Sequence, residues 1–351
     1  MKRSKHWNTS LMVTLMVTLV AYPCLGVAGD NQESSLTRSA SGAIVLPDIS
    51  VSGDTTTPPN TEVKPDPKAS DPATHPAVGL SSVNSSVDVL MADLDSKRNL
   101  TRFLSQPVVN DHNFEFIRNP IDACAGSAPP EVLFVIPSAP GNSEKRDRVR
   151  KGALGAYARE PSNNATVLFF TGTPDCSEDW ALQQAHIDDE FHLHGDIVQE
   201  NFPDVYRNIR LKAVSMLRWA VTYCKHAKYV IRTDDDVVVN VKQIVSVVRQ
   251  KHRDHLEFVI GVVKDDWKPA RNKGKYHMSV EEYPDPLYPP FALGGLLGYP
   301  LTSVALLYQA ALRVKPIWLD DVYITGICAS KVGVTLLRDP NFKFTHVKST
   351  K

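Results

Sequence analysis

Ile231-Arg232-Thr233-Asp234-Asp235-Asp236-Val237-Val238-Val239-Asn240 places three adjacent carboxylates directly after an apolar, strand-like run from Tyr229 to Thr233. Clustered carboxylates repel one another, so a half-buried trio needs a cation to be stable. Oxygen ligands on a short loop suit Mn²⁺ or Mg²⁺, ions that commonly bridge substrate phosphates. Because open α/β sheets hold their ligands at the carboxyl ends of strands, we interpret the triplet as a metal and diphosphate site. The alternative is a solvated acidic turn, which is the more common role of such triplets.

Strand-like apolar runs alternate with segments of helical periodicity on both sides of the triplet, and this pattern predicts an α/β fold. The predicted strands are 131–137, 166–170, 229–233 and 258–263, and the predicted helices are 144–157, 204–224, 241–250 and 302–313. The helix 204–224 is the best defined, because apolar residues recur along it at helical spacing and form one buried face. These residues are Leu211, Val214, Leu217 and Val221.

The N-terminal end has the composition of a membrane anchor. Residues 1–10 are basic at Lys2, Arg3 and Lys5, which predicts a cytosolic tail. Residues 11–28 are largely apolar over about 18 positions, just enough for a transmembrane signal-anchor helix. A cleaved signal peptide is the alternative, because the chain there ends in small residues suited to processing. Both interpretations predict that the rest of the chain lies outside the cytosol.

After residue 28 the composition changes at two points, residue 29 and residue 90. Residues 29–89 are rich in Ser, Thr, Pro and Asp and lack apolar periodicity, which predicts a disordered stem. Residues 90–351 are long enough for one substantial lumenal domain. The formal net charge is +0, which gives no indication of nucleic acid or an acidic polymer as a partner. The cysteines expected to form disulfides, with three pairings open, are Cys124, Cys176, Cys224 and Cys328.

The Asp triplet belongs to an ordered series of sequence blocks. The others are Arg146-Asp147-Arg148-Val149-Arg150, Phe169-Phe170-Thr171-Gly172, Asp196-Ile197-Val198-Gln199, Tyr206-Arg207-Asn208-Ile209-Arg210-Leu211-Lys212, Tyr288-Pro289-Pro290-Phe291, Gly294-Gly295 and Asp320-Asp321-Val322-Tyr323. The series resembles glycosyltransferase family 31, the β-1,3-galactosyl- and N-acetylglucosaminyltransferases. The resemblance implies a GT-A-like nucleotide-sugar-binding fold of the α/β class, with a mostly parallel central sheet.

The resemblance also implies an activity. It points to an inverting glycosyltransferase that moves galactose or an N-acetylhexosamine from a UDP-sugar to a glycan acceptor in β-1,3 linkage. The acceptor would be carried by a glycoprotein or a glycolipid. Combined with the N-terminal anchor, it implies a single-pass type II protein of the Golgi membrane whose catalytic domain, residues 90–351, is lumenal. Mn²⁺ would be the cofactor, because it neutralises the charge that grows on the leaving UDP.

Carried onto this sequence, the resemblance assigns residues to the metal and the donor. The metal ligands would be Asp236, Asp234 and His346. The donor-binding residues would be Asp234, Asp235, Arg146 and Arg150. The alternatives are ordinary ones, since a lone His is often structural and both arginines lie in a segment that is basic along its length.

The base of the reaction would be Asp321, which matches the acidic residue that deprotonates the acceptor hydroxyl in the family. The alternative for Asp320 and Asp321 is a helix N-cap, because Asp is favoured there and the segment 322–329 has helical character. One residue of the pair can cap the helix while the other is catalytic.

Four departures from the family pattern keep other functions open. Gly152-Ala153-Leu154 replaces Thr-Trp-Gly, Ala292 stands where many members have Cys, Asp320 replaces Glu, and the segment after Tyr323 is one residue longer. An inactive lumenal relative that acts as a chaperone or glycan-binding protein is therefore the main alternative. A phosphoryl- or nucleotidyl-transfer enzyme also uses clustered Asp, but the chain has no Gly-x-x-x-x-Gly-Lys phosphate loop.

Overall fold

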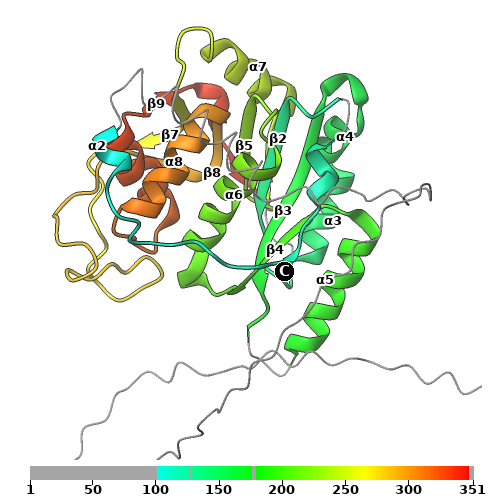
Figure 1. Cartoon of the computed structure of the whole chain (residues 1–351), viewed down its shortest axis with the longest axis horizontal. Helices are drawn as coiled ribbons and strands as arrows, with labels where there is room; N and C mark the ends of the chain where they lie inside the picture. The colour runs from blue at the N-terminus through cyan, green and yellow to red at the C-terminus, as the bar shows by residue number, and fades with distance from the viewer. Residues whose placement is uncertain (1–100, 126–127, 176–178, 348–351) are drawn as a thin grey trace, which may run out of the picture. The chain divides into compact units, whose positions relative to one another are not determined.

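The computed structural model describes residues 101–125, 128–175 and 179–347 (Figure 1). The predicted cytosolic tail, anchor and stem, residues 1–10, 11–28 and 29–89, lie outside these residues. Within the described ranges, no helix is both long enough and apolar enough to cross a bilayer. The domain predicted to begin at residue 90 is described from residue 101 onward.

Most strands of the described residues form one eight-stranded sheet of order β1-β4-β3-β2-β5-β8-β7-β9. The neighbours among β4, β3, β2 and β5 are parallel, as are β7 and β9, whereas β8 runs antiparallel to β5 and β7. The predicted α/β class with a mostly parallel central sheet is confirmed. The bounds are β1 Phe116–Arg118, β2 Val132–Pro137, β3 Ala165–Thr173, β4 Ile197–Pro203, β5 Tyr229–Thr233, β6 Val237–Val238, β7 Phe258–Lys264, β8 Phe291–Pro300, β9 Thr335–Arg338 and β10 Thr345–His346.

Helices cover both faces of this sheet (Figure 1). One apolar cluster packs α6 and α8 against one face, and a second packs α4 and α7 against the other. The α-helices are α2 Thr101–Leu104, α3 Ser143–Lys151, α4 Ala153–Arg159, α5 Trp180–His194, α6 Ile209–Tyr223, α7 Val241–Lys251, α8 Leu301–Arg313 and α9 Ala329–Val332. A π-helix spans Val322–Cys328, and 3₁₀ turns span Ile121–Cys124, Pro161–Asn163, Tyr206–Asn208 and Pro340–Phe342.

The predicted helix 144–157 is interrupted at Gly152, which separates α3 from α4. The Gly152 backbone is extended, with φ −80° and ψ −170°. A Cβ at this position would lie 2.9 Å from the carbonyl oxygen of Arg148, so the absence of a side chain lets the chain turn here. Periodicity alone could not locate the break, because α3 and α4 both have helical composition.

The structure differs from the sequence prediction in two further respects, the start of one helix and a strand that was not predicted. The predicted helix 204–224 starts only at Ile209, because Tyr206–Asn208 forms a 3₁₀ turn ahead of it. The sequence prediction omitted β8, whose composition is poor for a strand because it contains Gly294, Gly295 and Gly298. The predicted strands 131–137, 166–170, 229–233 and 258–263 correspond to β2, β3, β5 and β7.

One disulfide joins Cys124 to Cys224, with their Cα atoms 5.1 Å apart. It ties the 3₁₀ turn after β1 to the end of α6 across a sequence separation of 100 residues. Cys328 is a buried free thiol. The expectation that Cys328 forms a disulfide is therefore wrong, and Ala292, which stands where many family members have Cys, explains the missing partner. Cys176 lies outside the described residues.

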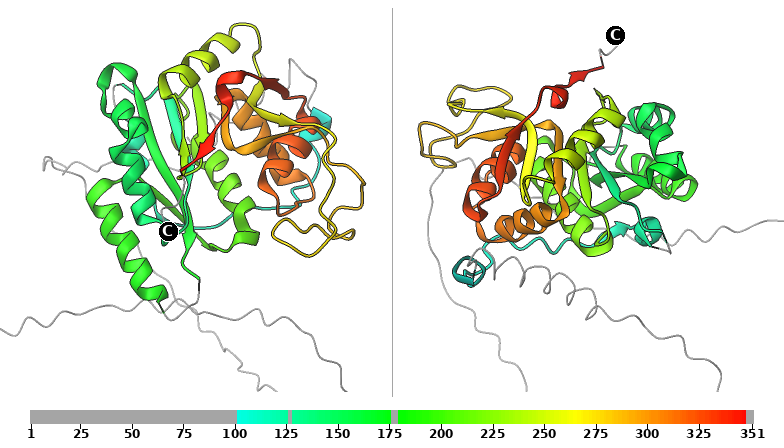
Figure 2. Two further views of the ribbon diagram at one scale, coloured as in Figure 1. Left: turned by 180° about the vertical axis from the view of Figure 1, so that it is seen from behind. Right: turned by 90° about the horizontal axis from the view of Figure 1, so that it is seen from above.

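The topology gathers distant segments at one edge of the sheet. β2 and β5 are adjacent and parallel, so the loop after β2 and the Asp triplet after β5 meet there. β8 runs antiparallel to β5 and contributes its first half, with Leu296 opposite Thr233. The segment that follows β9 returns to the same edge, where β10 pairs with β6 (Figure 2).

Candidate active site

Asp235 anchors the triplet to the loop after β2. Its side chain is buried, at 6% exposure, and Oδ2 accepts hydrogen bonds from Ser138 Oγ and Asn142 Nδ2, each at 2.8 Å. The Lys145 ammonium, on α3, lies 3.4 Å from Asp235 and 3.0 Å from Asp236. Asp235 is therefore held from two sides, and Lys145 supplies the positive charge that the adjacent carboxylates require.

Asp236 meets His346 through strand pairing. Because His346 of β10 lies opposite Val237 of β6, its Nδ1 comes within 2.9 Å of Asp236 Oδ1. The Val347 N–H also donates to the Asp236 carbonyl oxygen at 2.7 Å. Burial by itself raises the pKa of Asp236, but the hydrogen bonds from His346 and Lys145 outweigh it, so the pKa lies below its ordinary value. The predicted Asp236 and His346 pair is thus brought together in space.

Asp234 faces a different neighbour. Its carboxylate lies 3.7 Å from the guanidinium of Arg232, while its backbone N–H bonds to the Gly295 carbonyl oxygen at 3.3 Å. Burial is the main cause that raises the pKa of Asp234 to about 6, and Arg232 opposes this rise. Asp234 is therefore the member of the triplet that gains most from a nearby cation.

Arg232 connects the triplet to the second acidic pair. It is buried at 5% exposure, and its Nη1 forms an ion pair with Asp320 Oδ2 at 2.6 Å. A Cβ on Gly294 would lie 2.9 Å from Arg232 Nη2, so a residue with a side chain does not fit beside the guanidinium. Asp320 is therefore a buried ion-pair partner, and Arg232 stands between it and Asp234.

Asp321 caps the π-helix Val322–Cys328. Its Oδ1 accepts a hydrogen bond from the Val322 N–H at 2.8 Å, and the Gly294 N–H also donates to its carboxylate. Burial, followed by repulsion from Asp320, raises the pKa of Asp321 to about 7. The cap and the predicted base are thus the same residue, whereas the sequence left open how the two roles divide between Asp320 and Asp321. A carboxylate with a pKa near 7 suits proton abstraction at neutral pH.

Arg146 and Arg150, the predicted donor-binding arginines, are engaged within the protein. The buried Arg146 guanidinium donates to both Glu190 oxygens, at 2.8 and 2.6 Å, and its other donors bond to Ser138 Oγ, Ala139 O and Pro140 O. Arg150 makes a bidentate pair with Asp196, at 2.7 Å for both bonds. Arg146 thereby braces the loop that holds Asp235, whereas Arg150 joins α3 to the residue before β4. Direct contact of either arginine with a donor stays a prediction.

The residues present fit a metal ion that is completed by its substrate. Asp236 and His346 offer one carboxylate and one imidazole at a partly exposed point, and both donor types suit Mn²⁺. Within residues 101–125, 128–175 and 179–347, no set of three His, Cys, Asp or Glu side chains converges as a metal cage. A small protein-derived set is nevertheless usual for Mg²⁺-like ions, which take their other ligands from diphosphate and water.

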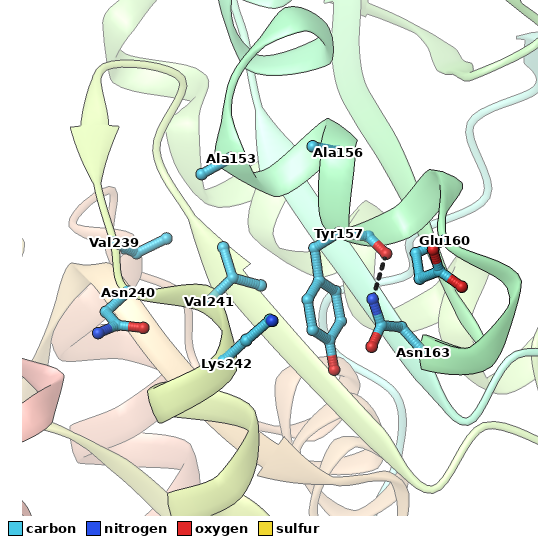
Figure 3. A pocket seen from close by; sticks show the side chains of 9 residues that line it. All are labelled: Ala153, Ala156, Tyr157, Glu160, Asn163, Val239, Asn240, Val241 and Lys242. Carbon is cyan, nitrogen blue, oxygen red and sulfur yellow. Dashed lines mark hydrogen bonds between the residues drawn. The ribbon is translucent and has the colours of Figure 1, made fainter.

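A groove outside this cluster lies between α4 and the start of α7 (Figure 3). Its volume is about 440 Å³, and Ala153, Tyr157, Val239 and Lys242 are among its lining residues. It reaches the chain shortly after Asp236, but none of the triplet carboxylates lines it. We therefore do not assign this groove to the donor.

Sequence reasoning missed four residues that hold the site together, namely Ser138, Asn142, Lys145 and Arg232. Arg232 carried a signal, because a charged residue inside an otherwise apolar strand needs a buried partner. Lys145 carried none, since it is one of several basic residues in α3 and only the fold determines which of them faces the triplet.

The comparisons with known proteins cover the region that builds this site. A family model described as galactosyltransferase matches residues 144–340, more than half of the chain. Beta-1,3-galactosyltransferase 2 of Homo sapiens is 29% identical over 242 residues, which are 68% of this chain and 56% of that protein. Beta-1,3-galactosyltransferase 1 of Mus musculus is 28% identical over 235 residues, which are 67% of this chain and 70% of that protein.

Among solved structures, a mannosyltransferase, PcManGT from Pyrobaculum calidifontis, in complex with GDP-Man and Mn²⁺, matches at 14% identity. The match covers 76% of this chain and 70% of that one, with a TM-score of 0.36, which is too low to carry an argument. The family assignment rests on the sequence instead. Because the family model spans residues 144–340, the chain belongs to the galactosyltransferase family.

Proposed function

We propose that this protein is an inverting, Mn²⁺-dependent glycosyltransferase that moves galactose or an N-acetylhexosamine from a UDP-sugar to a glycan in β-1,3 linkage. Membership of the galactosyltransferase family supports glycosyl transfer, and the relatives named above are β-1,3-galactosyltransferases. The chain spans 56% of the human relative's length, so the activity of that whole protein enters only as part of this proposal. A GT-A-like nucleotide-sugar site is consistent with the mostly parallel sheet.

The observation that carries the proposal is the placement of two unlike acidic sites on either side of Arg232. Asp234, next to the Asp236 and His346 pair, lies 3.7 Å from this guanidinium, and Asp320 lies 2.6 Å from it. Asp321 follows Asp320 and has a pKa of about 7. One side suits a diphosphate with its metal, and the other suits an acceptor hydroxyl that must lose a proton.

Each residue then has a defined task. Asp321 accepts the proton of the acceptor hydroxyl as that oxygen attacks the sugar carbon from the face opposite UDP. Asp320 and Arg232 position Asp321, and Asp235 fixes the triplet to the loop after β2. Asp236 and His346 would hold Mn²⁺ directly and Asp234 through water or a donor hydroxyl, and the ion would supply positive charge for the departing diphosphate. The alternative of an inactive binder gains no support from the site, because Asp236 and Asp321 are both present.

The cellular location belongs to the same proposal. We infer a type II Golgi membrane protein with its catalytic domain in the lumen, whose acceptor glycans are carried by glycoproteins or glycolipids. The Cys124–Cys224 disulfide is consistent with an oxidising compartment. The anchor itself rests on the composition of residues 11–28, which lie outside the described residues.

The proposal is tested with the full chain purified in detergent. UDP-galactose, UDP-N-acetylglucosamine and UDP-N-acetylgalactosamine are each incubated with neutral and acidic glycan acceptors, with Mn²⁺ or with excess chelator. Transfer that needs Mn²⁺ and yields a β-1,3 linkage by NMR supports the proposal. Undiminished turnover in chelator would exclude the metal-dependent mechanism. Absence of both transfer and donor hydrolysis with every donor would favour the inactive relative.

A further inference from the structure

The segment 267–277 combines positive charge with aromatic residues. Its sequence is Trp-Lys-Pro-Ala-Arg-Asn-Lys-Gly-Lys-Tyr-His, with Lys268, Arg271, Lys273 and Lys275 and no Asp or Glu. We call residues 267–277 the basic loop. The formal net charge of the whole chain is +0, so this concentration is local and does not appear in the overall balance. The connection from β7 to β8, which contains the basic loop, extends away from the sheet in yellow (Figure 1).

The basic loop is held in place by hydrogen bonds of its arginine and its backbone. Arg271 donates to the carbonyl oxygens of Met278, Ser279 and Asp285, at 2.7 to 3.0 Å. Its guanidinium therefore stabilises the conformation of the β7–β8 connection. Trp318 Nε1 donates to the His277 carbonyl oxygen at 3.2 Å. The loop is thereby tied to the segment that leads directly into Asp320 and Asp321.

Lys275 is the cation of this loop that lies over the Tyr206 ring. Its Nζ lies 5.0 Å from the centre of the Tyr206 ring and 5.4 Å from that of the Tyr276 ring. Both rings are solvent-exposed, and no carboxylate in the described part of the chain lies within ion-pair distance of this ammonium. Arg207, the residue after Tyr206, is by contrast paired with Glu282 at 3.5 Å. Lys275 therefore presents an unmatched charge on an aromatic surface.

This aromatic surface continues toward Asp321. The Tyr206 ring lies 5.6 Å from that of Trp318, two residues before Asp320. Burial, followed by the neighbouring Tyr276 and Asp320, raises the pKa of Tyr206 to about 12, in keeping with its position beside the acidic pair. The Tyr288 hydroxyl, 6% exposed as a residue, is buried with no hydrogen-bond partner in the described structure.

We propose that the basic loop binds an acidic group on the glycan acceptor, namely the carboxylate of a uronic or sialic acid or a sulfate ester. The inference rests on the proposed glycosyl transfer and names the acceptor class of the same site. A sugar ring next to the reacting residue stacks on Tyr206 and Tyr276, while its anionic substituent pairs with Lys275. A neutral acceptor would leave Lys275 without a partner.

The test uses the full chain and three variants. Lys275→Met keeps the length of the side chain and removes its charge, and Lys275→Arg keeps the charge. Lys225→Met is the matched control, because this exposed lysine precedes β5, at the end of that strand opposite to the Asp triplet. Acceptors share one reacting hexose and differ in the next residue, which is neutral, a glucuronate, a sialate or a 6-O-sulfated hexose. Both kcat/KM for transfer and equilibrium binding to the immobilised glycans are measured.

We expect the wild type to prefer at least one acidic acceptor over its neutral counterpart by roughly three- to tenfold at low salt, with the preference shrinking as salt is added. Lys275→Met should lose this preference while keeping its kcat/KM on the neutral acceptor, and Lys275→Arg should retain most of it. Lys225→Met should behave like the wild type. The acidic arm that responds identifies the anion as uronate, sialate or sulfate.

Several results would overturn the inference. These are equal use of neutral and acidic acceptors, an equal loss on both in Lys275→Met, or the same change in Lys225→Met. Binding to phosphatidylserine vesicles without binding to any acidic glycan would assign the loop to a membrane surface instead. If no donor is used at all, the proposed function fails, but the binding measurement still decides whether Lys275 recognises acidic glycans.

Discussion

Asp321→Asn separates the proposed catalytic task of this residue from its structural one. The amide oxygen of Asn can still accept the hydrogen bond from the Val322 N–H, so the start of the π-helix keeps its cap. The amide has no basicity, so the acceptor hydroxyl loses its proton acceptor. We expect transfer to fall by about a hundredfold or more while donor binding persists, because a positioned general base contributes about that much.

The same change should stabilise the protein at alkaline pH. The pKa of Asp321 is raised from 3.8 to about 7, mainly by burial, so the folded state binds this proton more tightly than the unfolded state does. Wild-type stability is therefore lost as pH rises through the window from about 4 to about 7. Three pKa units correspond to about 4 kcal/mol, and the weaker hydrogen bonds of an uncharged acceptor offset roughly half of it. We expect a net gain of about 1 to 3 kcal/mol in the free energy of unfolding at pH 8.

Two measurements check these expectations. Transfer assays across pH should show the wild-type rate rising about tenfold between pH 6 and pH 8, as a base with a pKa near 7 becomes ionised. Chemical denaturation at pH 4 and pH 8 should show that the advantage of Asp321→Asn grows with pH. Asp254→Asn, at an exposed position after α7, is the control for removing one carboxylate. Near-normal transfer by Asp321→Asn, or a stability advantage that is the same at both pH values, would refute the reasoning.

Three substitutions and one sequencing measurement test the rest of the site and the chain. Asp236→Ala should abolish Mn²⁺-dependent transfer without unfolding the protein. Retained Mn²⁺-dependent transfer would show that another residue binds the metal. Asp320→Asn should cost about 3 kcal/mol or more in denaturation, because it leaves Arg232 buried without its partner; a loss below about 1 kcal/mol would indicate a minor ion pair. Cys124→Ser should lower the free energy of unfolding by about 2 to 5 kcal/mol, and reductant should then have no further effect. N-terminal sequencing of the cell-expressed protein should find residue 1 or 2 first, and a start near Gly29 would instead mean a cleaved signal peptide.

The sequence predicted the elements next to the Asp triplet well but missed others on both sides of it, including α5 and β4 before it and β8 after it. β5 and the triplet were predictable, because a buried apolar run that ends in carboxylates has few other structures open to it. β8 was missed because its glycines are dictated by neighbours far away in sequence. A Cβ on Gly295 would collide with the Phe344 ring, and one on Gly294 would collide with Arg232. The strand propensity of the residues in β8 does not indicate either contact, because both partners are distant in sequence.

The candidate site divides in a similar way. Asp234, Asp236 and Asp321 were named from their sequence context and their resemblance to a family, and the fold brings Asp236 together with His346. The division of labour between Asp320 and Asp321 could not be predicted, since it depends on which carboxylate reaches Arg232. We predicted that Arg146 and Arg150 bind the donor. Their ion pairs with Glu190 and Asp196 could not be predicted from the sequence, because they depend on how α5 and β4 pack against α3.

The position of Lys145 bears on how the protein folds in a cell when no metal is bound. Its ammonium, 3.0 Å from Asp236 and 3.4 Å from Asp235, acts as a built-in counterion. Under the proposed Mn²⁺-dependent mechanism, we therefore expect newly made chains to reach their native fold before manganese binds. Manganese starvation should then leave a pool of correctly folded, idle protein that regains activity on resupply, with no need for new synthesis.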